Sequence, residues 1–282
     1  MRLHAPAKLN LCLYLGPTRA DGLHELCSLF EPLALADLIE VEPAGRDEVL
    51  CPAVEGENLA ARALAALREA GWKREPLRLR IEKRVPVAAG LGGGSADAAA
   101  VLRLATGEVG GLAEIAAGLG ADVPSQLRPA LALVRGAGEL VEPLPAPAPH
   151  AAVLLPDGGG LATADVFREA DRLGAGRSAA ELEELAGRLR LAAGAGASPL
   201  AFPELLVNDL EAPARSLRPA IGEALDALRE AGAPVAILSG SGPTAVGLFP
   251  DLGAAAAAAR RLGREDAIVC EAGTAPPLEV AP

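Results

Sequence analysis

Residues 84–100 read "RVPVAAGLGGGSADAAA", in which glycine fills four of the five positions 90–94 and small residues follow. The preceding stretch "LRLRIEKRV" (77–85) begins with apolar residues at every second position, which predicts a strand ending near Val85. The alanine-rich stretch predicts a helix beginning at Ser95. A glycine loop entering a helix N-terminus presents backbone N–H groups and the positive end of the helix dipole. The sequence therefore predicts a phosphate-binding loop, with glycine where a β-carbon would block close approach.

Two common phosphate loops are excluded by the residues that follow the glycines. No Lys-Ser or Lys-Thr pair comes next, so the stretch is not the P-loop of nucleotide hydrolases. Ser95 stands where the dinucleotide fingerprint has its third glycine. A plain glycine-rich turn, with Ser95 as the N-cap of the helix, remains an alternative at this point.

Composition and charge narrow the class of protein. The chain has 282 residues, of which 51% are hydrophobic and 22% charged, as in globular proteins of one large or two ordinary domains. A net charge of −11 opposes a nucleic-acid partner, because binding along a phosphate backbone needs clustered Lys and Arg. The four cysteines and three histidines are dispersed, so neither a zinc cluster nor a disulfide framework is indicated. Without a signal peptide or a long apolar run, we expect a soluble cytoplasmic protein with no membrane partner.

The order of patterns along the chain predicts two α+β halves. Strands are indicated by "KLNLCLYL" (8–15), "DLIEVEPA" (37–44) and residues 77–85, and a helix by "ENLAARALAALREAG" (57–71). Four prolines at alternate positions between 143 and 149 forbid a helix and favour a stiff connector, so we place the domain boundary there. Beyond it, residues 181–193 and 220–232 have helical patterns, and "PVAILSGSGPTAVGLF" (234–249) predicts two strands about a second glycine loop.

The pattern Pro86-x-x-x-Gly90-Leu91-Gly92-Gly93-Gly94-Ser95 resembles the phosphate loop of the GHMP small-molecule kinases. Further stretches resemble, in order and spacing, the 4-diphosphocytidyl-2-C-methyl-D-erythritol kinase family within that superfamily. They are "APAKLNLCLYLG", "ADGLHEL", "GLGGGSADAA", "GADVP", "GAGE", "VNDLE" and "LSGSGPT". The resemblance spans residues 5 to about 249. It implies a two-domain fold: a ribosomal-S5-like ATP-binding domain (1–148) and a ferredoxin-like substrate domain (149–282).

The same resemblance implies a function. Enzymes of this family transfer the γ-phosphate of ATP to the 2-hydroxyl of a cytidine-diphosphate-linked methylerythritol, in the non-mevalonate route to isoprenoid precursors. We expect ATP as phosphate donor, Mg²⁺ as its companion with ligands that the sequence does not identify, and this small molecule as substrate. The sequence is compatible with a monomer or a homodimer.

Lys8 of "PAKLN" and Asp122 of "GADVP" match the catalytic pair of that family. An alcohol is a poor nucleophile, so a carboxylate within hydrogen-bond reach accepts its proton, while an ammonium keeps that carboxylate ionised and stabilises charge. Taken alone, Asp122 is more typical of a helix N-cap before Val123-Pro124, and Lys8 of a solvated lysine at a strand end. Their joint match favours catalysis.

The remaining candidate residues follow from the resemblance in the same way. Asn10 shares a strand face with Lys8 and is expected to bind the substrate diphosphate or hydroxyl. His24 matches the histidine that recognises cytosine, and Thr163 and Phe167 match positions that hold the substrate, with Phe167 stacking on the base. The ATP-binding loop is expected to comprise Pro86, Val87, Ala88, Ala89, Gly90, Leu91, Gly92, Gly93, Gly94, Ser95 and Ala96.

Three departures from the family pattern keep rival functions open. Leu23 stands where the family usually has tyrosine, Ala96 where it has serine, and Ser125-Gln126 where it has an aromatic pair. A GHMP kinase of another small alcohol is therefore one alternative. A nucleotide-binding protein that has lost turnover is another, although the presence of Lys8 and Asp122 opposes it. An RNA-binding role, which only the ribosomal-S5-like topology suggests, is opposed by the negative net charge of the chain.

Overall fold

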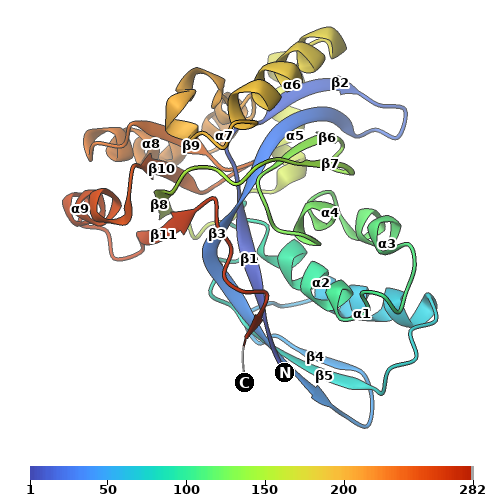
Figure 1. Cartoon of the computed structure of the whole chain (residues 1–282). Helices are drawn as coiled ribbons and strands as arrows, with labels where there is room; N and C mark the ends of the chain where they lie inside the picture. Colours follow the sequence, from blue (N-terminus) through green and yellow to red (C-terminus); the bar gives the residue numbers. More distant parts are fainter. Residues whose placement is uncertain (281–282) are drawn as a thin grey trace.

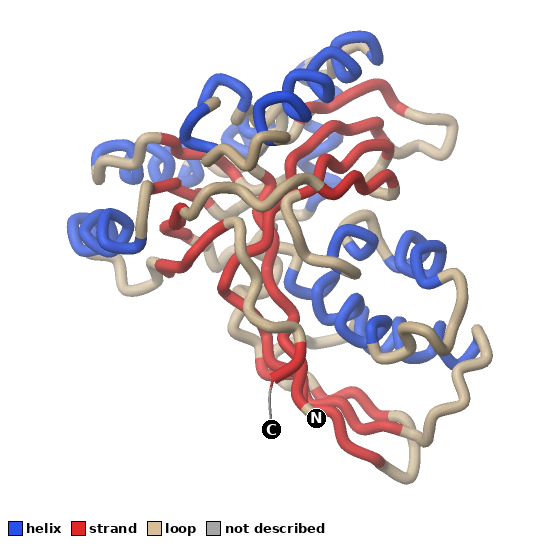
Figure 2. Tube along the Cα trace, in the orientation of Figure 1, coloured by secondary structure: helices blue, strands red, loops and turns tan. Residues whose placement is uncertain are grey.

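A single long strand, β3 (His24–Pro43), connects both halves of the molecule in a computed structural model that describes residues 1–280 (Figure 1). It pairs antiparallel with β1, β2, β5, β6 and β11. Along the sheet the order is β12-β1-β3-β11-β8-β10-β9. The strands run through the middle of the molecule and the helices lie in two outer groups (Figure 2).

The strands are β1 (Arg2–Asn10), β2 (Tyr14–Thr18), β3, β4 (Glu48–Leu50), β5 (Leu77–Glu82), β6 (Ala132–Gly136), β7 (Leu140–Pro143), β8 (His150–Leu155), β9 (Val235–Leu238), β10 (Ala245–Phe249), β11 (Ile268–Ala272) and β12 (Glu279–Val280). The helices are α1 (Leu59–Glu69), α2 (Gly93–Arg103), α3 (Leu112–Leu119), α4 (Val123–Gln126), α5 (Thr163–Leu173), α6 (Ala179–Ala193), α7 (Glu211–Leu217), α8 (Ala220–Glu230) and α9 (Leu252–Leu262). Two 3₁₀ turns occupy Pro199–Ala201 and Pro203–Leu205.

In the N-terminal half, α1 and α2 pack together against β1, β3 and β5. The predicted helix over 57–71 is confirmed as α1, which begins where the Asn58 side chain accepts a hydrogen bond from the Ala60 N–H at 2.8 Å. Its buried face includes Leu64 and Leu67, at helical spacing. This packing places α2, and the glycine loop that precedes it, on one side of the sheet.

In the C-terminal half, β8, β9, β10 and β11 form an antiparallel sheet whose apolar face is covered by α5, α7, α8 and α9. The predicted helices over 181–193 and 220–232 are confirmed as α6 and α8, and the predicted strand pair as β9 and β10. Helix α6 instead lies over the opposite side, against β2 and β3. The C-terminal half therefore contributes to the core of the N-terminal half as well.

The predicted strand over 8–15 is wrong in the middle. β1 ends at Asn10 and β2 begins at Tyr14. Between them the Leu13 N–H donates to the Val207 carbonyl at 2.9 Å, so a contact from the C-terminal half breaks the strand. Residues 144–149 are extended with no regular element, and the domain division at 148/149 stays a prediction.

A buried polar pair lies where the halves meet. His150 begins β8 and Glu31 lies on β3; both side chains are fully buried, and His150 Nε2 is 3.2 Å from each carboxylate oxygen of Glu31. β11 pairs with β3 through Ala272 and Leu33 next to this contact. Among residues 1–280, no helix is both long enough and apolar enough to span a bilayer.

Candidate active site

Two adjoining hollows lie between the halves. The larger, of about 790 Å³, is lined by Lys8, Asn10, Asp122, His24 and Phe167 among others. The smaller, of about 450 Å³, is lined by residues 86–95 of the glycine loop. Gly90, Gly92, Ser95 and Thr163 line both hollows. The structure thus brings the predicted catalytic, loop and substrate residues to one continuous cleft, except Ala96, which is fully buried in α2 and lines neither hollow.

Lys8 lies at the floor of this cleft with only 4% of its surface exposed. Its ammonium is 3.2 Å from Asp122 Oδ2, donates to Asn10 Oδ1, and lies 4.5 Å from the centroid of the Phe30 ring. A buried ammonium needs such partners, because an unpaired charge out of water is costly. The Lys8 backbone N–H also donates to the Leu91 carbonyl at 2.9 Å, which ties β1 to the glycine loop.

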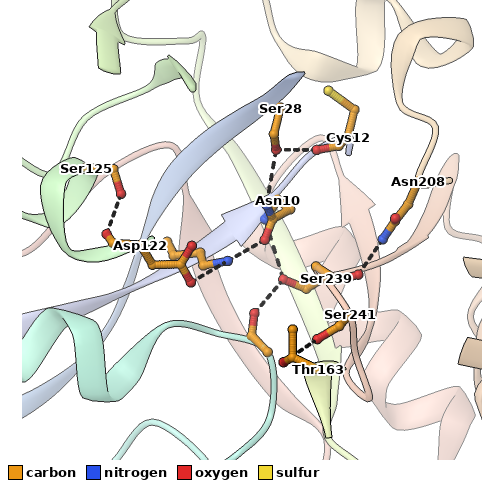
Figure 3. Close-up of polar contacts among 12 residues, drawn as sticks. Asn10, Cys12, Ser28, Asp122, Ser125, Thr163, Asn208, Ser239 and Ser241 are labelled. Carbon is orange, nitrogen blue, oxygen red and sulfur yellow. Dashed lines mark hydrogen bonds and ion pairs between the residues drawn. The ribbon is translucent and has the colours of Figure 1, made fainter. Parts of the chain in front are cut away.

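Asp122 precedes α4 but does not cap it. Its side chain, drawn in Figure 3, makes no hydrogen bond to the first turn of the helix, and Asp122 Oδ2 lies 3.2 Å from Lys8 Nζ instead. Asp122 therefore occupies the N-cap position without a capping hydrogen bond from its side chain, and Lys8 is buried, not solvated. The Ser125 hydroxyl donates to the Asp122 backbone carbonyl at 2.8 Å and holds this turn in place.

The helix after the glycine loop begins earlier than the sequence predicts. α2 starts at Gly93, with Gly92 as its N-cap in the left-handed region at φ 67°, while β5 ends at Glu82. Ser95 therefore lies inside the first turn, and its interpretation as the N-cap is wrong. Gly92 has no side chain to cap the helix, so the first-turn N–H groups are free to bind an anion.

Glycine is also required at these positions because neighbouring protein atoms leave no room for a β-carbon. A β-carbon on Gly92 would lie 2.8 Å from Lys8 Cγ and 3.0 Å from its Cε. One on Gly90 would lie 2.6 Å from the Gly242 carbonyl oxygen and 2.7 Å from that of Ser239. These positions are closed to any side chain even before a phosphate approaches.

The second glycine loop, residues 239–243, packs on the first. The Ser239 hydroxyl donates to the Gly90 carbonyl at 3.1 Å and accepts from the Asn10 N–H at 3.4 Å. Asn208 also holds the loop, because its Nδ2 donates to the carbonyls of Leu238 at 2.9 Å and Gly240 at 2.7 Å. Sequence reasoning predicted a glycine loop here but assigned no role to Ser239 or Asn208.

The far end of the larger hollow contains the predicted base-recognition residues. The His24 and Phe167 rings are tilted, with centroids 5.5 Å apart. His24 Nε2 is 3.2 Å from Asp171 Oδ1, a partner on α5 that sequence reasoning missed. Leu23 beside them is 54% exposed. Thr163 Oγ1 lies 3.0 Å from Ser241 Oγ, where the two hollows join.

A buried ion cluster that the sequence did not indicate lies beside the glycine loop, where Lys83 and Asp97 also line the smaller hollow. Lys83 Nζ donates to Asp97 Oδ2 at 2.7 Å and to Asp37. Asp37 Oδ1 also accepts from the N–H groups of Arg84 at 2.6 Å and Val85 at 2.8 Å. In the described part of the chain, Asp97 Oδ1 finds no hydrogen-bond partner. Burial raises the pKa of Asp97 to about 7, and Lys83 offsets part of this shift.

Among known proteins, a 4-diphosphocytidyl-2-C-methyl-D-erythritol kinase of Anaeromyxobacter dehalogenans is 43% identical over 270 residues, covering 90% of this chain and 82% of its own length. One from Salinispora tropica is 40% identical over 284 residues, covering 94% of this chain and 87% of its own. The chain belongs to this kinase family. Models of the GHMP kinases N-terminal and C-terminal domains match residues 58–127 and 177–268.

Solved structures agree with the family. A crystal structure of 4-(cytidine 5'-diphospho)-2C-methyl-D-erythritol kinase superposes with a TM-score of 0.80 at 36% identity, covering 97% of this chain and all of that one (100%). A homoserine kinase from Cytophaga hutchinsonii gives a TM-score of 0.68 at 16% identity, covering 97% and 94% of the two chains, and shows the shared fold alone. The predicted two-part GHMP kinase fold is confirmed.

Replacing Gly92 with alanine should lower the kinase turnover number by roughly 10- to 100-fold, because the new methyl group displaces Lys8 and strains the left-handed backbone. Steady-state kinetics of the purified variant measure this. Gly118→Ala is the control, since its methyl group enters open space on α3. Equal turnover of the Gly92 variant and the parent would show that Lys8 keeps its place without this glycine.

Replacing Asp97 with asparagine should change how stability depends on pH. Because the pKa of Asp97 is raised in the folded state, its contribution to stability is full below the ordinary carboxyl pKa and is lost as pH rises towards about 7. We expect the melting temperature of Asp97→Asn to match the parent near pH 4 and to exceed it at pH 8 by roughly 2–4 °C or more. Calorimetry across this range tests it, and a constant difference at every pH contradicts it.

Proposed function

We propose that this chain transfers the γ-phosphate of ATP to the 2-hydroxyl of 4-diphosphocytidyl-2-C-methyl-D-erythritol, in the non-mevalonate route to isoprenoid precursors. The observation that carries the proposal is the Lys8–Asp122 pair, 3.2 Å apart, in the cleft that also contains the glycine loop. Membership of the kinase family supports the substrate and ATP as the phosphate donor.

The ATP phosphates bind residues 86–96 in this proposal. The first-turn N–H groups of α2 lack a side-chain cap, and the helix dipole adds a partial positive charge there. The larger hollow reaches the same residues Gly90, Gly92 and Ser95 from the other side. A γ-phosphate on this loop therefore faces the Lys8–Asp122 pair.

Asp122 accepts the proton of the attacking hydroxyl, and Lys8 stabilises negative charge on the phosphoryl group. The Asp122 side chain retains 30% exposure, so an alcohol can reach it, while the Lys8 side chain at 5% is fixed by its partners. Placing the attacking hydroxyl oxygen, the γ-phosphorus and the oxygen of the leaving ADP in line, with the carboxylate beside the hydroxyl, supplies much of the rate acceleration in phosphoryl transfer. The presence of both Lys8 and Asp122, 3.2 Å apart at the cleft, opposes the alternative of a binding protein without turnover.

The substrate occupies the larger hollow, with its hydroxyl end at Asp122 and its cytosine at His24 and Phe167. Phe167 offers a π-face and His24 a hydrogen-bonding ring at that end. Asn10 and Thr163 line the hollow in between and contact the diphosphate or the erythritol hydroxyls. These assignments follow the match to the family and stay proposals.

Mg²⁺ accompanies ATP in this proposal. In the described residues no group of three His, Cys, Asp or Glu side chains is arranged to hold a metal ion. Mg²⁺ does not need three protein ligands, because it keeps several waters and binds substrate phosphates together with one or two protein oxygens. The Ser95 hydroxyl and the Asp122 carboxylate are oxygens of this kind at the cleft. When bound, the ion neutralises charge on the phosphates.

A coupled ADP-release assay tests the function. The purified protein is given ATP, Mg²⁺ and one acceptor at a time: the cytidylyl substrate, mevalonate, homoserine or galactose. We expect turnover with the cytidylyl substrate alone. Turnover with another alcohol would support a different GHMP kinase activity. That alternative is considered because Leu23 stands where the family usually has tyrosine. Background hydrolysis with all four would support a nucleotide-binding protein without turnover.

Replacing Asp122 with asparagine should preserve the fold and ATP binding but remove the proton acceptor, and should lower turnover by roughly 10²- to 10⁴-fold. Lys8→Ala should lower it comparably, because the ammonium acts mainly in the transition state. Steady-state kinetics with both substrates saturating measure both. Turnover of Asp122→Asn within a few-fold of the parent rejects its assignment, and an effect of Lys8→Ala on melting temperature alone rejects the role of Lys8.

Leu23 should weaken binding of the cytidine end, because it offers no π-face opposite Phe167 and base–aromatic stacking contributes roughly 1–3 kcal/mol. Leu23→Tyr should therefore bind cytidine diphosphate about 5- to 100-fold more tightly than the parent, and Phe167→Ala more weakly. Calorimetric titration of the three proteins measures the dissociation constants. If neither change alters affinity, the base does not bind between these residues, and another alcohol substrate becomes the better proposal.

A further inference from the structure

We infer that Ser28 is a positioning residue for Lys8, acting through the side chain of Asn10. The inference rests on the proposed kinase function and concerns a residue outside the cleft. Ser28 lies on β3, is fully buried, and lines neither hollow. Its hydroxyl nevertheless belongs to the hydrogen-bond chain that ends at the catalytic pair.

The chain of hydrogen bonds runs across two neighbouring strands. Lys8 and Asn10 share one face of β1, and Ser28 and Phe30 share one face of β3. Lys8 Nζ donates to Asn10 Oδ1, and Asn10 Nδ2 donates to Ser28 Oγ at 3.1 Å. The Ser28 hydroxyl then donates to the carbonyl of Cys12, in the break between β1 and β2 (Figure 3).

The chemistry of these groups fixes the direction of every bond. A backbone carbonyl can only accept, so the Ser28 proton points to Cys12 and a Ser28 lone pair remains for Asn10. Asn10 must therefore turn its NH₂ group to Ser28 and its oxygen to Lys8. The lysine ammonium can only donate, so this is the one amide orientation that satisfies all four groups.

Loss of the Ser28 hydroxyl removes the constraint on the Asn10 amide. Its NH₂ group would then lack a buried acceptor, and the amide could rotate to place NH₂ against the ammonium of Lys8. Lys8 is only 4% exposed and cannot replace the lost oxygen with bulk water. It would shift from its place beside Asp122, and a shift of about 1 Å at reacting groups lowers turnover by roughly 10²-fold.

The hydroxyl can be tested separately from its volume. Threonine and valine have nearly the same shape and differ in one hydroxyl, so Ser28→Thr and Ser28→Val form a matched pair, with Ser28→Ala as the smaller deletion. In the ADP-release assay we expect Ser28→Val and Ser28→Ala to lose about 10- to 100-fold in kcat. We expect Ser28→Thr to stay within about threefold of the parent, and KM for both substrates to change little in all three.

A double-mutant cycle separates positioning from packing. If Ser28 acts through Asn10, then Ser28→Ala should lower kcat in the parent and have no further effect in an Asn10→Ala background. Ser178→Ala, which removes the N-cap hydroxyl of α6, is the control for loss of stability alone and should leave kcat unchanged.

Every result of these two experiments either supports the role of Ser28 or overturns it. Equal kcat for Ser28→Thr and Ser28→Val, or additive losses in the cycle, overturns the inference, and so does a Ser28→Ala protein as active as the parent. If Ser28→Ala does not fold, the threonine and valine pair still gives the comparison. No ADP release by the parent with the cytidylyl substrate would instead defeat the proposed function, and the two failures are therefore distinguishable.

Discussion

The burial of one ammonium group, that of Lys8, organises this active site. A charge removed from water must be compensated, and three different kinds of partner do so here: the carboxylate of Asp122, the amide oxygen of Asn10 and the ring face of Phe30. The side chain has room to lie there only because Gly92 has no β-carbon. The glycine loop thus contributes to the geometry of the proposed catalytic pair as well as to the proposed binding of phosphate.

The cleft is a joint product of both halves. The backbone of Gly90 packs directly on the carbonyls of the second glycine loop, and Ser239 bonds both to Gly90 and to the strand that carries Lys8. Thr163 at the start of α5 bonds to Ser241 of the same loop. The second glycine loop of the C-terminal half therefore contacts the strand and the loop that position the proposed catalytic pair, although that pair lies in the N-terminal half.

The sequence predicted the elements whose patterns are local, and the cleft residues through the family resemblance. The helix over 57–71, the two strands about the second glycine loop and the glycine loop before α2 needed only periodicity and glycine spacing. What it missed depends on contacts between distant segments. The break after Asn10 needs the Val207 carbonyl, and the roles of Ser28 and Ser239 need strands brought together by folding. The alternative in which Ser95 caps the helix is wrong because glycine fills the N-cap position of α2 without a side-chain bond.

The sharing of β3 between the halves has a consequence for synthesis on the ribosome. Residues 1–148 emerge first, and at that stage β3 lacks β11, so the backbone near Leu33 is an open strand edge and Glu31 lacks His150. An unpaired edge is a template for pairing with another chain. The N-terminal half must therefore keep this edge exposed until residues 268–272 arrive, and its solubility in the cell depends on how soon translation delivers them.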